Sequence, residues 1–120
     1  MFGNAALTMV NIWATWCPSC IDELPNIQQL YSAYYGRVQV VTILEDASAQ
    51  TDSALQILNE LGVTVPVIRC NKSVRAAFGA HADLTMLPVT FFVDSNGHIL
   101  KTVYNAQSYD KWCSIINGLL

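Results

Sequence analysis

The sequence predicts an α/β fold in which a central mixed β-sheet is covered by helices on both faces. Short apolar segments rich in β-branched residues alternate with segments whose apolar residues recur at helical spacing. The last two strand-like segments flank Asp94-Ser95-Asn96-Gly97, a composition typical of a hairpin turn. Because 52% of the 120 residues are hydrophobic and only 12% are charged, we expect a single domain over residues 1–120.

The first half of the chain is predicted to contain two strands and two helices. Leu7–Ala14 is an apolar run typical of a buried strand, and Ser19–Tyr35 repeats apolar residues at helical spacing. Val38–Leu44 is apolar and β-branched, as in a buried parallel strand. Thr51–Leu61 repeats leucines at helical spacing, and we expect Gly62 to end that helix.

The second half is predicted to add three strands and two helices. A short strand over Val65–Arg69 precedes a short helix over Ser73–Phe78. The strands Val89–Val93 and His98–Tyr104 form the C-terminal hairpin, and Tyr109–Leu120 is the closing helix.

Charge and hydropathy exclude several classes of partner. The 6 basic and 9 acidic residues leave a net charge of −3, which provides no basic face for nucleic acid or for an anionic membrane. We find no segment long enough to span a bilayer, and the residues before Leu7 lack the basic start of an export signal. We expect any export signal or membrane anchor to lie upstream of this sequence.

The segment Trp16-Cys17-Pro18-Ser19-Cys20 carries the chemistry, because it joins a predicted buried strand to a predicted helix. Two thiols at this spacing close a small disulfide and reopen it by exchange with another protein. At a helix N-terminus, Cys17 has its thiolate stabilised by unpaired backbone N–H groups, so we predict that Cys17 is the nucleophile. Cys20, one turn later and more buried, is then the resolving thiol, and Pro18 suits a first helical turn.

The cysteines allow other interpretations. A structural zinc site requires a second closely spaced pair of ligands, which the sequence lacks, so we expect no metal and no other cofactor. A thiol peroxidase in which Cys17 attacks peroxide, with Thr15 two residues earlier, and a non-catalytic module that binds clients remain alternatives. Cys70 and Cys113 either form a second disulfide or stay as separate buried thiols.

Two stretches of the chain resemble a known family. They are Val10-Asn11-Ile12-Trp13-Ala14-Thr15-Trp16-Cys17-Pro18-Ser19-Cys20 with Glu23-Leu24-Pro25, and Leu87-Pro88-Val89-Thr90-Phe91-Phe92-Val93-Asp94 with Asn96-Gly97. These stretches resemble the thioredoxin fold and, more narrowly, the TlpA/ResA-like thiol-disulfide oxidoreductases of bacterial envelopes. The extra helix and strand between Asp46 and Arg69 resemble the insertion of that branch. The hairpin that commonly precedes the first strand is not evident here.

The resemblance implies a function and a location. Such proteins lie outside the cytoplasm, in the periplasm or on the outer face of the cytoplasmic membrane, and often carry an N-terminal anchor. They usually reduce disulfides of client proteins, such as an apocytochrome c or another exported protein. A membrane or envelope electron donor is expected to reduce the cysteine pair again.

The resemblance also assigns roles to single residues. Pro88 matches the family's cis-proline, against which a client backbone docks beside the cysteines. Asn11 stands where thioredoxin has a buried acid, so the proton-transfer candidates are Glu45 and Asp46, just after the second predicted strand. Glu23 is interpreted as a residue of a helix face rather than as a proton carrier.

The residues expected to contact the client border the cysteines and the cis-proline: Trp16, Pro18, Ser19, Met86 and Leu87. No basic side chain in Pro18-Ser19 stabilises a thiolate, and the nearby Asp22 and Glu23 oppose one. The sequence therefore predicts a moderately reducing couple rather than a strong oxidant.

Overall fold

A five-stranded mixed sheet forms the centre of the protein. The computed structural model describes residues 5–45 and 51–120. The strand order is β3-β2-β1-β4-β5, with β2 parallel to both β1 and β3, and with β4 antiparallel to both β1 and β5. The strands are β1 (Leu7–Trp13), β2 (Val38–Leu44), β3 (Val67–Arg69), β4 (Val89–Asp94) and β5 (Ile99–Tyr104).

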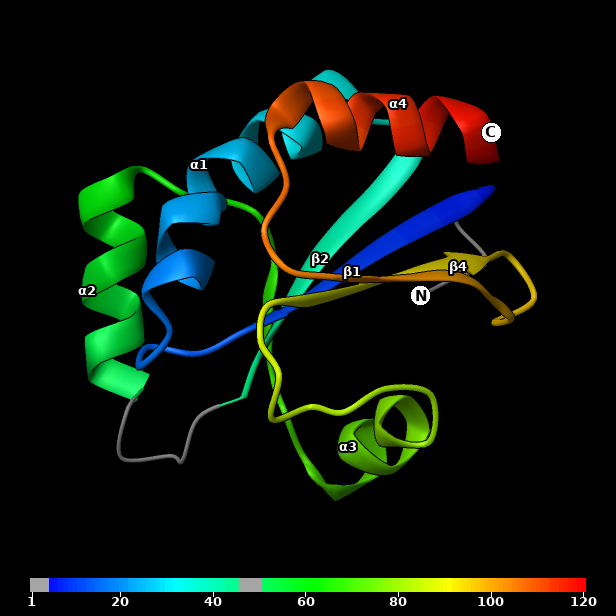
Figure 1. Cartoon of the computed structure of the whole chain (residues 1–120). Coiled ribbons are helices and arrows are strands. Elements are labelled where there is room, and N and C mark those ends of the chain that lie inside the picture. Colours follow the sequence, from blue (N-terminus) through cyan, green and yellow to red (C-terminus); the bar gives the residue numbers. More distant parts are fainter. Residues whose placement is uncertain (1–4, 46–50) are drawn as a thin grey trace.

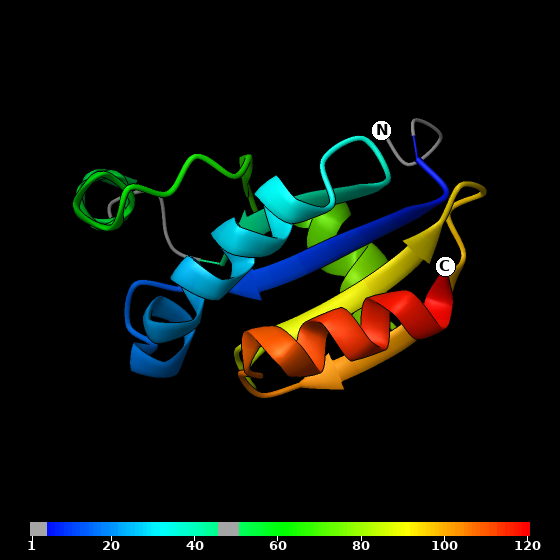
Figure 2. The same cartoon turned by 90° about the horizontal axis from the view of Figure 1, so that it is seen from above.

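Helices cover both faces of this sheet. They are α1 (Pro18–Ala33), α2 (Thr51–Leu61), α3 (Lys72–Gly79) and α4 (Tyr109–Leu119). In Figure 1, α1 and α4 lie over one face and α3 lies under the other, and Figure 2 shows α1 and α4 side by side above the strands. The predicted thioredoxin-like fold is confirmed, including the α2–β3 insertion. Within residues 5–45 and 51–120, no helix is both long and apolar enough to cross a membrane.

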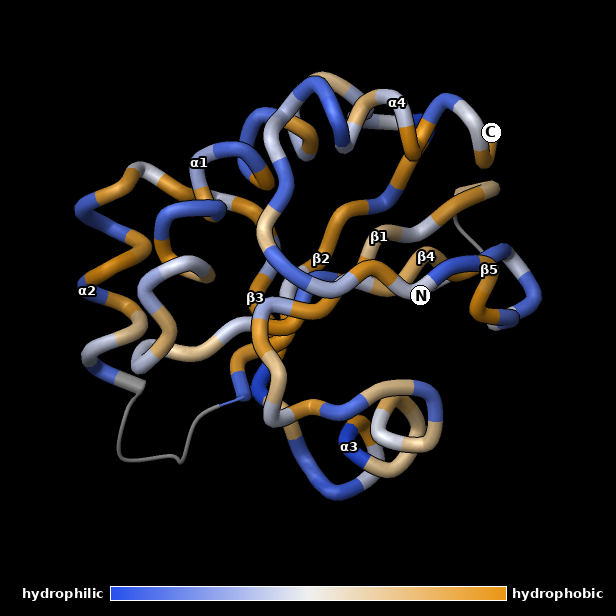
Figure 3. The backbone as a smooth tube through the Cα atoms, in the orientation of Figure 1, coloured by the Kyte–Doolittle hydropathy of each residue, from blue (hydrophilic) through white to orange (hydrophobic). Residues whose placement is uncertain are grey.

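The core divides between the two faces because side chains alternate along each strand. All seven residues of β1 are buried. Leu7 and Met9 pack toward α1 and α4, whereas Val10 and Ile12 pack on the face that α3 covers. In Figure 3, β2 is mostly orange, the hydrophobic end of the scale, whereas β1 shows paler stretches between hydrophobic ones. This packing fixes the end of β1, from which the cysteine segment departs.

The structure shortens one predicted strand at its start. The backbone N–H groups of Thr64 and Val65 donate to Gln28 Oε1, at 2.8 and 2.9 Å. Because α1 uses these donors, the ladder with β2 begins only at the Pro66 carbonyl, which accepts from Thr42 N at 2.8 Å. β3 therefore starts at Val67, two residues later than predicted.

The two remaining cysteines do not pair. Cys70 packs on the face of the sheet that α3 covers, whereas Cys113 is a residue of α4 and packs on the opposite face. Both thiols are free. The sheet lies between them, so the alternative of a second disulfide is wrong for this fold.

Candidate active site

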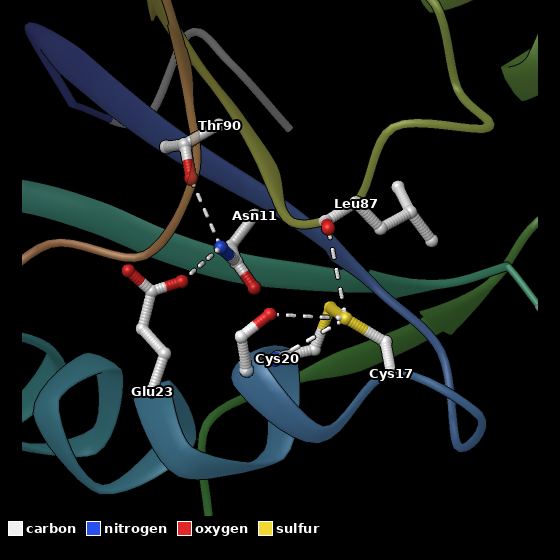
Figure 4. Close-up of a disulfide and its surroundings, with 7 residues drawn as sticks. Asn11, Cys17, Cys20, Glu23, Leu87 and Thr90 are labelled. Atoms are coloured by element: carbon white, nitrogen blue, oxygen red, sulfur yellow. Dashed lines mark hydrogen bonds between the residues drawn. A yellow bond between two sulfur atoms is a disulfide. The ribbon is translucent and has the colours of Figure 1, made fainter.

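Cys17 and Cys20 form a disulfide where α1 begins (Figure 4), with their Cα atoms 5.3 Å apart. Cys17 is the N-cap, and its Sγ accepts the Cys20 backbone N–H at 3.3 Å. Ser19 Oγ lies 3.5 Å from the same sulfur, and Pro18 occupies the first helical turn without needing a donor. The donors at this helix end therefore point at Cys17, as expected for the nucleophile.

The turn that contains Pro88 faces the Cys17 side of the disulfide. The Leu87–Pro88 peptide bond is cis. The Leu87 carbonyl oxygen lies 3.7 Å from Cys17 Sγ (Figure 4), and Pro88 itself is buried. This geometry brings together Cys17, Cys20 and Pro88, three of the residues predicted for the site.

Large apolar side chains flank this turn on the surface. Trp16 is 60% exposed and Met86 is 59% exposed, whereas Trp13 is fully buried. Pro18 and Ser19 are also exposed, and Leu87 is half-buried. The five residues predicted to contact a client are thus at least partly accessible.

A buried carboxylate lies one helical turn after Cys20 (Figure 4), and it corrects the interpretation of Glu23 as a helix-face residue. Glu23 is only 2% exposed. Its Oε1 accepts from Asn11 Nδ2 at 3.3 Å, and the same amide nitrogen donates to Thr90 Oγ1 at 2.9 Å. Asn11 therefore does not leave the site without an acid, because it holds the acid supplied by α1.

Two further donors complete the environment of Glu23. Its Oε2 accepts from Gln107 N at 2.8 Å and from Trp112 Nε1 at 3.0 Å. Burial raises the pKa of the Glu23 carboxyl, while the hydrogen bonds from Gln107, Trp112 and Asn11 oppose that rise. A carboxyl with a raised pKa suits proton exchange with a thiol better than an exposed one does.

A signal for this residue was present in the sequence. Glu23 follows Cys20 by three positions and precedes the apolar Leu24, and residues three apart on a helix lie on the same side, so the spacing places Glu23 near Cys20. Spacing alone does not distinguish this buried position from a solvated one, because most charged residues in proteins face water.

Of the two predicted proton-transfer candidates, Glu45 is the one that the structure describes, and its contacts include Arg75 and Trp13. Glu45 Oε1 accepts from Arg75 Nη2 at 2.6 Å, and its backbone N–H donates to the Trp13 carbonyl. The described contacts of Glu45 include neither Cys17 nor Cys20. Asp46 lies outside the described residues.

Cys70, close to Glu45, is a poor candidate for a second reactive thiol. Burial, assisted by the hydrogen bond and charge of Glu45, raises the pKa of Cys70 to about 11. At neutral pH this thiol stays protonated, and protonated thiols react slowly. Among the residues that the structure describes, no cluster of three or more His, Cys, Asp or Glu side chains exists that could hold a metal ion.

The fold and the Cys17–Cys20 disulfide define the class of thioredoxin-like proteins with a CxxC redox disulfide. The chain belongs to the AhpC/TSA family, whose sequence pattern matches residues 2–102. This membership and the relatives described next confirm the resemblance inferred from the sequence.

The relatives include thiol-disulfide oxidoreductases. The chain is 30% identical to the thiol-disulfide oxidoreductase ResA of Oceanobacillus iheyensis, over 92% of this chain and 56% of that protein. It is 35% identical to the thiol:disulfide interchange protein CycY of Rhizobium leguminosarum, over 78% of this chain and 47% of that protein. The chain thus spans about half the length of these relatives.

A solved structure shares the fold. A secreted disulfide oxidoreductase of Mycobacterium tuberculosis superposes with a TM-score of 0.74 at 19% identity, over 93% of this chain and 81% of that chain. At this identity the likeness establishes the fold alone.

Proposed function

We propose that this protein is a thiol-disulfide oxidoreductase that reduces disulfides of client proteins in the cell envelope, such as those of an apocytochrome c or another exported protein. The observation that carries the proposal is the Cys17–Cys20 disulfide at the N-terminus of α1, with an accessible apolar border and a buried carboxylate one turn behind it. The activities of ResA and CycY support the same chemistry.

The exchange proceeds through two sulfur displacements. In the reduced protein, the Cys17 thiolate attacks one sulfur of the client disulfide, the client S–S bond breaks, and the other client sulfur leaves as a thiolate. Cys20 then attacks Cys17 Sγ, which restores the Cys17–Cys20 disulfide and releases the second client sulfur. Glu23 is a buried acid one turn after Cys20 on the same face of α1. It accepts the Cys20 proton as that thiol becomes a nucleophile.

The surroundings of Cys17 favour a reducing couple. One backbone N–H and the Ser19 hydroxyl face the sulfur, while the Leu87 carbonyl oxygen presents its negative end to it. The first turn of α1 carries no charged residue. A thiolate stabilised so weakly leaves the dithiol form less favoured, which lowers the reduction potential.

The need for an electron-donating partner follows from the proposed reduction of client disulfides. A reductant that ends each cycle as a disulfide requires an electron donor, which we propose to be a membrane or envelope dithiol protein. An extracytoplasmic location agrees with the secreted M. tuberculosis protein that shares the fold.

A covalent trap tests the role of each cysteine. Cys20→Ser retains the nucleophile but lacks the resolving thiol, so mixed disulfides with a reducible protein substrate should accumulate and disappear on adding dithiothreitol. Cys17→Ser should form none, and Cys70→Ser serves as the matched control that behaves like the wild type. Binding that survives the loss of both cysteines, or consumption of peroxide in place of disulfide reduction, would instead support the two alternative functions.

A redox titration tests the direction. We expect a potential well below that of a strong disulfide donor, which is about −120 mV. A measured potential near that value would show that the protein oxidises its clients.

A further inference from the structure

One short connection touches both sides of the candidate active site. It consists of residues 104–107, which begin at the last residue of β5 and lead toward α4, and in Figure 1 it runs from the sheet up to α4. None of its residues was singled out in the sequence. We call it the 104–107 connection.

On the client side, the connection supports the turn that carries Leu87 and Pro88. Asn105 N donates to the Pro88 carbonyl oxygen at 3.0 Å. The Tyr104 hydroxyl accepts from Asp83 N at 3.2 Å, which ties the start of the same loop to β5. The position of the Leu87 carbonyl beside Cys17 therefore depends on this connection.

On the acid side, the connection binds α1 through a single residue. Gln107 N donates to Glu23 Oε2 at 2.8 Å, and the Gln107 carbonyl accepts from Asn26 Nδ2 at 3.5 Å. In Figure 4 the ribbon of this part of the chain passes beside the labelled Glu23 and Thr90.

Two internal features hold the connection in one shape. The Gln107 side-chain amide donates to the carbonyl oxygens of Tyr104 and Asn105, each at 3.3 Å. Asn105 has a φ of 70°, the left-handed region that asparagine tolerates better than most residues. The Gln107 hydrogen bonds and the Asn105 backbone conformation together therefore hold the two ends of the connection in a fixed relation to each other.

We propose that the 104–107 connection is a positioning element of the reaction. Asn105 holds the Pro88 turn in place beside Cys17, and Gln107 holds the Glu23 carboxylate in place near Cys20. Because both residues belong to one connection, the two positions are coupled. This inference rests on the proposed function. Asn105 and Gln107 are positioning residues, because their contacts are with Pro88 and Glu23 and not with sulfur.

The proposal predicts how Glu23 titrates when the connection loosens. The groups that contact its carboxylate are the Asn11 amide from β1, the Gln107 backbone and the Trp112 indole from α4, and none of these titrates near neutral pH. Cys20 is the titratable group one turn earlier on α1. Weakening the Gln107 N–H donation removes part of what lowers the pKa, so the pKa of Glu23 should rise.

Three variants and one control test this. Asn105→Val disfavours the left-handed backbone, whereas Asn105→Gly adopts it freely and should rescue the wild-type behaviour. Gln107→Ala removes the two internal side-chain hydrogen bonds. Gln56→Ala, which removes only a surface contact with Glu60, is the matched control.

The measurements separate geometry from activity. The NMR shift of the Trp112 indole N–H follows Glu23 ionisation, because that group donates to the carboxylate. In Asn105→Val and Gln107→Ala we expect this titration to move up by about half to one pH unit, and the acidic limb of protein-disulfide reduction to move with it. Their rate near neutral pH should fall about three- to tenfold.

Each outcome decides the proposal. A Trp112 titration and an activity profile within about 0.2 pH unit of the wild type in both variants would overturn it. If Asn105→Val does not fold, Gln107→Ala alone decides, since it leaves the backbone preference unchanged. Failure of the wild-type protein to reduce any protein disulfide would overturn the proposed function instead, and the indole titration would still test the geometry.

Discussion

Asn11 on β1 and Glu23 on α1 are joined by a hydrogen bond of 3.3 Å that crosses from the sheet to the active-site helix. Both residues are almost fully buried, at 1% and 2% exposure. A buried carboxyl is retained in this core because neutral donors surround it, so its ionisation is linked to folding.

Replacing this carboxyl should change how stability depends on pH. Burial raises the pKa of Glu23 in the folded state above its ordinary value of 4.5, so between these two values the folded state binds more protons than the unfolded state. The wild-type free energy of unfolding should therefore fall as pH rises through this window, by up to about 1.4 kcal/mol for each unit of pKa shift. Glu23→Gln should lack that fall when urea unfolding is measured from about pH 4 to about pH 8.

Asp83 provides the control, because its pKa is shifted in the opposite direction to that of Glu23. The Thr85 hydroxyl and backbone N–H lower the pKa of the exposed Asp83. Asp83 should therefore add stability that is lost as the pH falls below its ordinary pKa of 3.8, which requires urea unfolding to be extended down to about pH 2. Asp83→Asn should remove this loss at low pH without changing the fall assigned to Glu23. Identical profiles for the wild type and Glu23→Gln would contradict the prediction.

Cys70 should become more reactive when Glu45 loses its charge. After burial, the hydrogen bond and charge of Glu45 are the main causes that raise the pKa of Cys70 to about 11. In a Cys17→Ser, Cys20→Ser background, Glu45→Gln should speed alkylation of Cys70 about three- to tenfold at about pH 8.5, as measured by peptide mass mapping.

The exposed carboxylate of Glu60, which contacts Gln56 on α2, is the matched control. Glu60→Gln should leave the alkylation of Cys70 unchanged. Equal rates in Glu45→Gln and its parent would show that burial alone suppresses this thiol.

Gln28 should contribute measurably to the stability of the fold, whereas the adjacent Gln29 should not. Its side chain accepts from Thr64 N and Val65 N and donates to Thr64 Oγ1 at 2.8 Å, which fastens the segment before β3 to α1. Gln28→Ala leaves two backbone donors without this partner, and we expect a loss of about 1–2 kcal/mol in the free energy of unfolding. Gln29 is exposed on the same helix, so Gln29→Ala should lower the free energy of unfolding by less than about 0.5 kcal/mol. A similar loss in both variants would show that helix propensity dominates.

Trp16 should matter for protein substrates more than for small ones. Its indole is 60% exposed beside Cys17, so it is available to apolar side chains of an unfolded client. Trp16→Ala should slow reduction of a protein disulfide about tenfold, while reduction of a small aromatic disulfide changes less than about threefold.

Tyr35, which is 76% exposed and follows the other end of α1, is the matched aromatic control. Tyr35→Ala should affect neither substrate. Equal slowing of both substrates by Trp16→Ala would place the indole effect on the sulfur chemistry instead of on client binding.

The sequence by itself determined the elements whose signals are local. The spacing of Cys17 and Cys20 and the Pro at the start of α1 lie within four consecutive residues, and the apolar runs of β1 and β2 show directly which strands are buried. Helix α2 was predicted with both ends correct, because leucine periodicity and Gly62 mark it.

Only the tertiary structure decided the polar interior of the site. Glu23 is 84 and 89 residues from the Gln107 and Trp112 donors that hold it, and Asn11 is 79 residues from Thr90. Such pairings depend on how β4, β5 and α4 pack onto α1, which no local pattern encodes. The resemblance pointed to Glu45 and Asp46, whereas the fold buries Glu23. A charged residue is buried only when distant donors compensate for its lost hydration, and no local pattern shows those donors.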